Sequence, residues 1–289
     1  MPSDSTPKYH QKVYPNFSLK DKVYIVTGGG RGLGLVIAEA MTEAGADGLS
    51  FCLSVFPVLT GVIVHCFDVL PKPVSEFYVS QEIANNDHIG SLHYHHVDVR
   101  DLKHLEEAVD RVAGLSGRID GLVAAAGIQQ LKDAVDFTLE DVTRMLDVNY
   151  TGLFMTVQAV ARHMIESGTR GSIVLVASMS GFVANKGLHS ATYNSSKAAV
   201  VQLGRNLAME WGPKGIRVNS LCPGHIITPM VEKNFEEVPE LKEIWIKESM
   251  LGRLARPEEF TGAVVFMLSE ASSYMTGSSL IIDGGHTAW

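Results

Sequence analysis

The chain has 289 residues, enough for one large domain or two small ones, and its 46% hydrophobic and 19% charged residues indicate a soluble globular protein with a sizeable core. A formal net charge of −8, with no basic block to offset it, argues against nucleic acid as the main partner. The three cysteines Cys52, Cys66 and Cys222 form no C-x-x-C pair and are odd in number, so we expect free thiols in a reducing, cytoplasmic environment.

The first residues are polar and lack the apolar segment of a secretory signal. We therefore expect a flexible N-terminal arm over residues 1–18. No linker or internal repeat divides the rest of the chain, so residues 19–289 should form a single domain.

From Lys22 onward, short apolar runs alternate with longer amphipathic stretches. The run KVYIVTG has the pattern of a buried strand, and the following GLVIAEAMTEAGA has helical spacing. Further apolar runs lie at 92–97, 121–126, 171–177, 216–221 and 279–282, and helical stretches at 102–115, 138–166, 193–211 and 257–268. Repeated strand–helix units predict an α/β fold, a mainly parallel sheet with helices on both faces.

One segment interrupts this alternation. Residues 48–67 contain no Lys, Arg, Asp or Glu, which meets the length criterion for a transmembrane helix. Attachment to a membrane through 48–67 is therefore one alternative. A spanning helix there would break the sheet, and Pro57 and Gly61 interrupt the run. We instead predict no membrane contact, an apolar insertion over about residues 48–63, and a second strand, VIVHCF, that ends beside Asp68.

A glycine-rich segment, TGGGRGLG (Thr27 to Gly34), follows the first strand and opens the first helix. Glycine allows a tight turn and close approach of the backbone to a pyrophosphate, which the helix N-terminus then faces. This context raises an otherwise weak motif to a candidate dinucleotide site.

A tyrosine and a lysine lie four residues apart in ATYNSSKAAV. On the predicted helix Tyr193 and Lys197 share one face. An ammonium one turn away favours the phenolate of a tyrosine, whose pKa is near 10 in water. The spacing alone is weak evidence for an acid/base pair.

The motifs together, in their order, resemble the short-chain dehydrogenase/reductase family. They are the glycine loop at 27–34, DV at 98–99, AAAG at 124–127, VN at 148–149, Ser178, YNSSK at 193–197, PG at 223–224 with Thr228, and DGG at 283–285. The resemblance covers about residues 19–289 apart from the insertion, and is nearest to fungal sorbose and xylulose reductases. It implies a single doubly wound Rossmann domain with a seven-stranded sheet. It also implies an NAD(P)-dependent oxidoreductase that interconverts a carbonyl and a secondary alcohol, of the ketone, ketose or polyol class, by hydride transfer.

The resemblance assigns four catalytic residues. Tyr193 would be the general acid in reduction and the general base in oxidation, and Lys197 would favour its phenolate and bind the nicotinamide ribose. Ser178 would hydrogen-bond the substrate oxygen, with Ser180 as a rival, and Asn149 would hold a water that links the lysine to solvent.

The resemblance also assigns the cofactor contacts. Asp98 would accept from the adenine amino group, and Ile226 and Thr228 would contact the carboxamide. Asp68 at the end of the second strand would accept from the adenosine 2′-OH and favour NAD(H), whereas Arg31 could pair with the 2′-phosphate of NADP(H), so NAD(H) is only slightly favoured. The expected cofactor-binding residues are Thr27, Gly28, Arg31, Gly32, Leu33, Gly34, Asp68, Asp98, Val99, Ala126, Gly127, Asn149, Tyr193, Lys197, Pro223, Gly224, Ile226 and Thr228.

Two departures from the family pattern affect the site. Ala124 and Ala125 stand where asparagines are usual, which leaves the bracing of that strand in doubt. The spacing of fifteen positions between Ser178 and Tyr193 is slightly long, so we expect a loop around ANKGLHSAT that changes the pocket wall.

Other expectations concern the surface. The charge-rich stretch after Thr228 should be part of a substrate lid over about residues 228–256. The HYHH run at 93–96 places His93 and His95 on one side of a strand and His96 on the other, so we expect no metal site there. The apolar end SLIIDGGHTAW resembles a subunit contact, and we expect a homo-oligomer, a tetramer. The remaining alternative is a cofactor-binding family member without redox turnover, against which the four catalytic residues argue.

Overall fold

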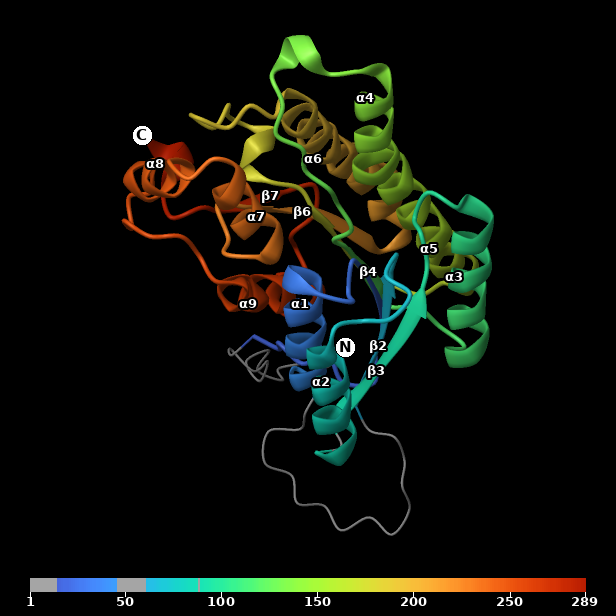
Figure 1. Ribbon diagram of the computed structural model, residues 1–289. Helices are drawn as coiled ribbons and strands as arrows, with labels where there is room; N and C mark the ends of the chain where they lie inside the picture. The colour runs from blue at the N-terminus through green and yellow to red at the C-terminus, as the bar shows by residue number, and fades with distance from the viewer. Residues whose placement is uncertain (1–14, 46–60, 88) are drawn as a thin grey trace, which may run out of the picture.

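Seven parallel strands form one sheet in the order β3-β2-β1-β4-β5-β6-β7 (Figure 1). The computed structural model of the chain describes residues 15–45, 61–87 and 89–289. The strands are β1 (Val23–Thr27), β2 (Val62–Asp68), β3 (Gly90–His96), β4 (Gly121–Ala124), β5 (Gly171–Val176), β6 (Ile216–Pro223) and β7 (Ser279–Ile282). The sequence-based prediction of a doubly wound parallel sheet is confirmed.

Helices cover both faces of this sheet. Figure 1 shows α1 (Gly32–Glu43), α2 (Ser75–Asn86) and α9 (Thr261–Leu268) on one side of it, with α3 (Leu102–Ser116), α5 (Leu153–Ser167) and α6 (Ala191–Trp211) on the other. The shorter α4 (Leu139–Leu146), α7 (Pro229–Glu237) and α8 (Leu241–Glu248) lie beyond these layers.

Alternate residues of the central strands contribute to two separate cores. Ile25, Leu122 and Ile173 pack with α3, α5 and α6. Their neighbours Val26 and Val174 pack with α1 and α9 on the opposite face. Side chains of a strand point alternately to the two faces, so a strand buried on both sides has to be apolar throughout. This explains the continuous apolar runs in the sequence.

The helical stretch predicted over residues 138–166 is divided in two. Thr138 caps α4 by accepting from Asp141 N, and the chain then forms a π-helical segment, Asp147–Gly152, before α5 begins. The predicted helical stretch is therefore confirmed, with a π-helical turn inside it that the sequence did not indicate. A π-segment inserts an extra residue per turn and often marks a functional position, and here it contains Asn149.

The second strand ends at Asp68, as predicted, and pairs with both β1 and β3. Because β2 begins at Val62, the predicted insertion over 48–63 extended two residues too far. Its remaining part from 48 to 60 lies outside the described residues. A single membrane-spanning helix over 48–67 was wrong for its last six residues, which form the strand. In the described ranges no helix has the length and apolar character needed to cross a bilayer.

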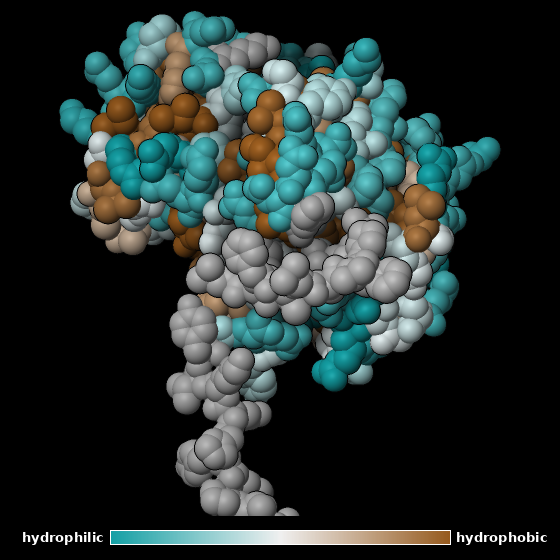
Figure 2. Space-filling view, turned by 90° about the horizontal axis from the view of Figure 1, so that it is seen from below, coloured by the Kyte–Doolittle hydropathy of each residue, from teal (hydrophilic) through white to brown (hydrophobic). Residues whose placement is uncertain are grey.

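On the face in Figure 2, hydrophobic residues form several separate areas among hydrophilic ones. Residues 1–14 of the predicted arm are outside the described residues, whereas Asn16 O already accepts from Ala271 N at 3.0 Å. Cys66 and Cys222 are free thiols, as predicted, and Cys52 is not among the described residues.

The histidines of β3 lie as the alternation predicted. His93 and His95 both contact His65 of β2, while His96 Nε2 lies 3.1 Å from Val69 O. His65 Nδ1 and His95 Nε2 are 2.9 Å apart. Within the described part of the chain, no group of three or more His, Cys, Asp or Glu side chains could hold a metal ion.

Candidate active site

A cavity of about 620 Å³ opens where several strands of the sheet end. It extends from the glycine loop after β1 to Ser178 after β5 and to the loop after β6. In open parallel sheets ligands bind at the carboxyl ends of the strands, where the strand order reverses, and here the reversal lies between β1 and β4. All the predicted site residues line this cavity except Thr27 and Asn149.

The glycines of the loop after β1 allow its backbone to pack closely against the start of α1. Gly28 has φ +70°, and a methyl group added to Gly34 would lie 2.1 Å from Gly28 O. The start of α1 therefore packs directly on the turn, and α1 begins at Gly32 with its free amide groups at the cavity. This arrangement can accept a phosphate group.

Thr27 and Asn149 brace the backbone beyond β4 instead of lining the cavity. Thr27 Oγ1 accepts from Ala125 N and Ala126 N, both at 3.1 Å. Asn149 Oδ1 accepts from Ile128 N at 2.8 Å, and its Nδ2 donates to Ile128 O at 2.9 Å. These bonds supply the bracing that the alanines of AAAG left in doubt.

The Asp68 carboxylate is fixed at one end of the cavity. It is 6% exposed and accepts from Gly30 N at 3.0 Å and from Leu70 N at 3.1 Å. Arg31 lines the same cavity. The strand position predicted for Asp68 is confirmed, and both residues proposed to select the cofactor belong to this cavity.

Asp98 has a partner that the sequence did not reveal. Arg100 donates to its carboxylate through Nε at 3.0 Å and through Nη2 at 2.6 Å, and this bond holds the pKa of Asp98 below its usual range. The neighbouring Val99 packs against Gly152 of the π-helical segment. A methyl group added at Gly152 would lie only 2.8 Å from Val99 Cγ2.

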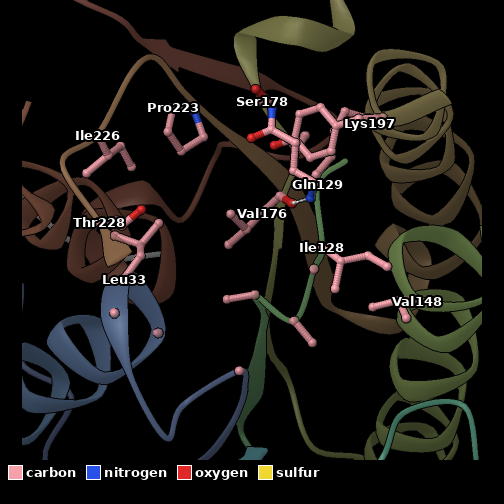
Figure 3. Close-up of a pocket in the computed structure, with 18 of the residues that line it drawn as sticks. Leu33, Ile128, Gln129, Val148, Val176, Ser178, Lys197, Pro223, Ile226 and Thr228 are labelled. Carbon is pink, nitrogen blue, oxygen red and sulfur yellow. Dashed lines mark hydrogen bonds between the residues drawn. The ribbon is translucent and has the colours of Figure 1, made fainter. Parts of the chain in front are cut away.

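The opposite end holds Ser178, Tyr193 and Lys197. Tyr193 is hydrogen-bonded to Ser178, and Lys197 Nζ lies 5.7 Å from the centre of the Tyr193 ring and donates to Val176 O at 2.8 Å. Figure 3 shows Ser178 and Lys197 close together across the cavity from Ile226 and Thr228, with Leu33 from the start of α1 below. The Ser180 hydroxyl instead accepts from Asn185 Nδ2 at 2.6 Å, which favours Ser178 over its rival.

Burial is the largest influence on the pKa values of Tyr193 and Lys197. It raises the pKa of Tyr193, against a smaller opposing effect of the hydrogen bond from Ser178, and it lowers the pKa of Lys197 to about 8. The expectation that the ammonium lowers the tyrosine pKa was wrong for the chain alone. Desolvation disfavours both charged forms.

The Asn149 side chain lies close to Lys197. A methyl group at Gly127 would lie 3.4 Å from Asn149 Oδ1 and 3.5 Å from Lys197 Nζ, so both atoms adjoin the same glycine. Asn149 Nδ2 also donates to Ser196 Oγ at 3.1 Å.

The loop after β6 and the two helices that follow close the cavity. Pro223, Gly224 and Ile226 line it, and Thr228 caps α7 by accepting from Val231 N. Leu188, Leu241, Trp245 and Leu254 form a small apolar cluster of their own between α7, α8 and the neighbouring loops. We call α7 and α8 the cover helices, and they occupy the predicted lid region.

Sequence reasoning missed several residues in the wall. Asn185 and Leu188 come from the predicted loop before Tyr193, and Gln129, His225 and Trp245 also line the cavity. The unusual length of that loop was the only local signal for the first two. Nothing local indicated that Trp245 of α8 would meet His225.

Comparisons with known proteins agree with this geometry. A family model described as enoyl-(acyl carrier protein) reductase matches residues 79–287. A short-chain dehydrogenase/reductase of Aspergillus versicolor is 39% identical over 278 residues, which are 94% of this chain and 89% of the relative. The chain belongs to the short-chain dehydrogenase/reductase family. It is an NAD(P)-dependent enzyme of that family, as the motifs predicted.

Other short-chain dehydrogenase/reductases are similar over nearly their whole length. Galactitol 2-dehydrogenase of Rhizobium johnstonii is 37% identical, covering 97% of this chain and 99% of the relative. The crystal structure of a gluconate 5-dehydrogenase from Burkholderia cenocepacia with NADP and tartrate has a TM-score of 0.80 at 28% identity, covering 95% of this chain and 98% of that one. Carveol dehydrogenase from Mycobacterium avium with NAD has a TM-score of 0.81 at 26% identity, with 96% and 100% covered.

Proposed function

We propose that the enzyme interconverts a secondary alcohol and a ketone of the ketose and polyol class, with Tyr193 as acid and base. The observation that carries the proposal is the partly buried Tyr193, hydrogen-bonded to Ser178 and adjacent to Lys197 at one end of the cavity. The name of the galactitol 2-dehydrogenase supports the substrate class.

The cavity fits a nicotinamide cofactor. The close approach of Gly34 to Gly28 leaves the start of α1 open toward the cavity, and Asp68 lies at the same end. Gly28, Arg31, Leu33, Asp68 and Asp98 would hold the adenosine and phosphate portions. When bound, the cofactor supplies or accepts the hydride.

The chain's own groups manage the proton and the substrate oxygen. Ser178 donates a hydrogen bond that fixes the substrate oxygen beside the phenol. In reduction the Tyr193 O–H bond breaks and its proton passes to that oxygen, and in oxidation the phenolate takes the proton back. Because burial raises the pKa of Tyr193, the phenol is protonated at neutral pH. Reduction should therefore be favoured near pH 7 and oxidation at alkaline pH.

Asp68 supports a slight preference for NAD(H). Its buried carboxylate can accept from a ribose hydroxyl and repels a phosphate. Arg31, on the same cavity, has the opposite effect, and the gluconate 5-dehydrogenase structure contains NADP.

We also propose a cytoplasmic homotetramer. The strand β7 lies at an edge of the sheet, Ile281 is 37% exposed and Trp289 is 79% exposed, which suits a contact between copies. Free Cys66 and Cys222 fit a reducing compartment. Light scattering at micromolar concentration tests the assembly, and a monomer would contradict it. Cell fractionation tests the location, and recovery in a membrane fraction would contradict it.

The decisive experiment is Tyr193→Phe, with Tyr150→Phe as the control. Tyr150 lies on the π-helical segment and does not line the cavity. Tyr193→Phe should lower turnover of a ketose or polyol by at least about a hundredfold while NADH still binds, because general acid–base catalysis contributes about 10²–10⁴-fold. Turnover within tenfold of the wild type would refute the role of Tyr193.

A further inference from the structure

Three polar atoms in the cavity wall have no hydrogen-bond partner among the described residues. They are Asn185 Oδ1, His225 Nε2 and Trp245 Nε1. Asn185 is 5% exposed and Trp245 is 1% exposed. Buried polar atoms in proteins nearly always have a partner, so three exceptions in one cavity point to a ligand that supplies it.

These atoms come from three elements around the cavity. Asn185 lies on the loop between Ser178 and Tyr193, and its Nδ2 donates to Ser180 Oγ at 2.6 Å, which leaves Oδ1 as the free atom. His225 lies two residues after β6, which ends at Pro223, and Trp245 belongs to α8. The rings of His225 and Trp245 stack with centres 3.7 Å apart and planes 4° apart, so the two rings lie flat against each other in this wall of the cavity.

We propose that Asn185, His225 and Trp245 recognise hydroxyl groups of the substrate beyond its reacting carbon, which makes the enzyme specific for polyhydroxylated alcohols and ketones. This inference rests on the proposed function and adds the residues that bind the hydroxyl groups along the substrate chain. It selects sugar alcohols and ketoses over ketones and alcohols with an apolar chain.

The chemistry of the three atoms matches hydroxyl groups. The amide oxygen of Asn185 can only accept and the indole N–H of Trp245 can only donate, while His225 can do either. A hydroxyl group both donates and accepts, so it can pair with all three. An apolar chain would leave every one of them unpaired, and sites with unpaired polar groups reject such analogues strongly.

Neutral groups also suit hydroxyls better than carboxylates. Burial lowers the pKa of His225 to about 3, so its ring is uncharged near neutral pH. Neither Asn185 nor Trp245 carries a charge. This wall therefore lacks the cation that would stabilise a buried carboxylate.

The hydroxyls reach these atoms by displacing the cover helices. The three atoms are buried from solvent in the described conformation. The cover helices pack through their own apolar cluster, and Asn234 Nδ2 of α7 donates to Gln129 Oε1 of the cavity wall at 2.8 Å. A small outward movement of α8 would expose Trp245 without disturbing the two main cores, which do not include α8.

The test compares galactitol and D-arabinitol with 2-hexanol, each with NAD and with NADP. Trp245→Phe keeps an aromatic ring on His225 and removes only the N–H donor. The matched control is Trp211→Phe at the end of α6, outside this cavity. Asn185→Leu is a second variant on another element, and melting temperatures confirm that each variant is folded.

The wild type should prefer its better polyol over 2-hexanol by at least a hundredfold in kcat/KM. Trp245→Phe and Asn185→Leu should each lower kcat/KM for the polyol at least tenfold, or about 1.4 kcal/mol, mainly through KM. Each should change kcat/KM for 2-hexanol less than threefold, and Trp211→Phe should alter neither.

The outcomes separate this inference from the proposed function. A wild type that is active on polyols but has variants within threefold of it, or variants that lose both substrates equally, would overturn the inference alone. So would a wild type that prefers 2-hexanol. A wild type with no turnover of any of these alcohols would overturn the proposed function and the inference with it.

Discussion

Replacing Asp68 by asparagine should change the choice of cofactor. The Asp68 carboxylate is 6% exposed and is held by Gly30 N at 3.0 Å and Leu70 N at 3.1 Å, so it cannot easily turn away from a phosphate. The two amides donate to different oxygens of the carboxylate, so asparagine keeps an acceptor for one of them, loses the other hydrogen bond and removes the charge. The variant should therefore fold and bind NADPH better relative to NADH.

The size of the change can be worked out from electrostatics. Two like unit charges 4 Å apart repel by roughly 4 kcal/mol at an effective dielectric constant of about 20. If water and salt screen half of this, about 2 kcal/mol remains, or roughly a 30-fold change in the ratio of dissociation constants. Asp68→Ala should shift the ratio in the same direction, but it also removes the partner of two backbone amides, so it should lower the free energy of unfolding as well.

The assay is calorimetric titration with NADH and NADPH, which needs no substrate. The control is Asp87→Asn at the end of α2, an exposed residue outside the cavity whose substitution changes the net charge equally. A ratio within threefold of the wild type in Asp68→Asn would refute the role of the carboxylate. An equal shift in the control would show that net charge alone was responsible.

Three further predictions test the site and the fold. Lys197→Met should raise the dissociation constant of NADH at least tenfold and lower turnover. Because burial lowers the pKa of Lys197 to about 8, the wild-type affinity for NADH should weaken from pH 7 to pH 9. An equal weakening in Lys197→Met would show that the Lys197 ammonium is not its cause. Gly34→Ala should lower stability and cofactor affinity, because its methyl group would lie 2.1 Å from a backbone oxygen, whereas Gly114→Ala, with nothing within 4 Å, should gain up to about 1 kcal/mol in thermal or urea unfolding; equal effects would be a failure. Burial lowers the pKa of His65 to about 3 from 6.5, so the unfolded chain binds more protons in between, and the stability that its neutral ring contributes is present above pH 6.5 and is lost as the pH falls toward 3. Between pH 7 and pH 5 this loss should be about 2 kcal/mol of the free energy of unfolding, and His65→Val should reduce the difference measured by urea unfolding at the two pH values by that amount. An unchanged difference would rule out His65 as the source of the pH dependence.

The sequence alone determined the fold and the neighbourhood of the reaction. Periodicity of apolar residues marked every strand of the sheet within a few residues, because a strand buried on both faces must be apolar throughout and an amphipathic helix must repeat every 3.6 residues. The glycine loop was recognised from its place between a strand and a helix, whereas Ser178, Tyr193 and Lys197 were assigned through the resemblance to the family, because the spacing alone is weak evidence. All of them line one cavity.

Only the tertiary structure decided which side chains meet across long separations. Thr27 bonds to Ala125 and Ala126, 98 and 99 positions further along the chain, and so takes over bracing that the alanines cannot provide. His225 and Trp245 stack although a loop and α7 separate them in sequence. The local pattern of apolar and polar residues indicates which face of a segment packs on the core. A hydrogen bond or ring contact between distant segments depends on where the fold places both of them. Burial, which raises the pKa of Tyr193 and lowers that of Lys197, is likewise a property of the whole packed chain.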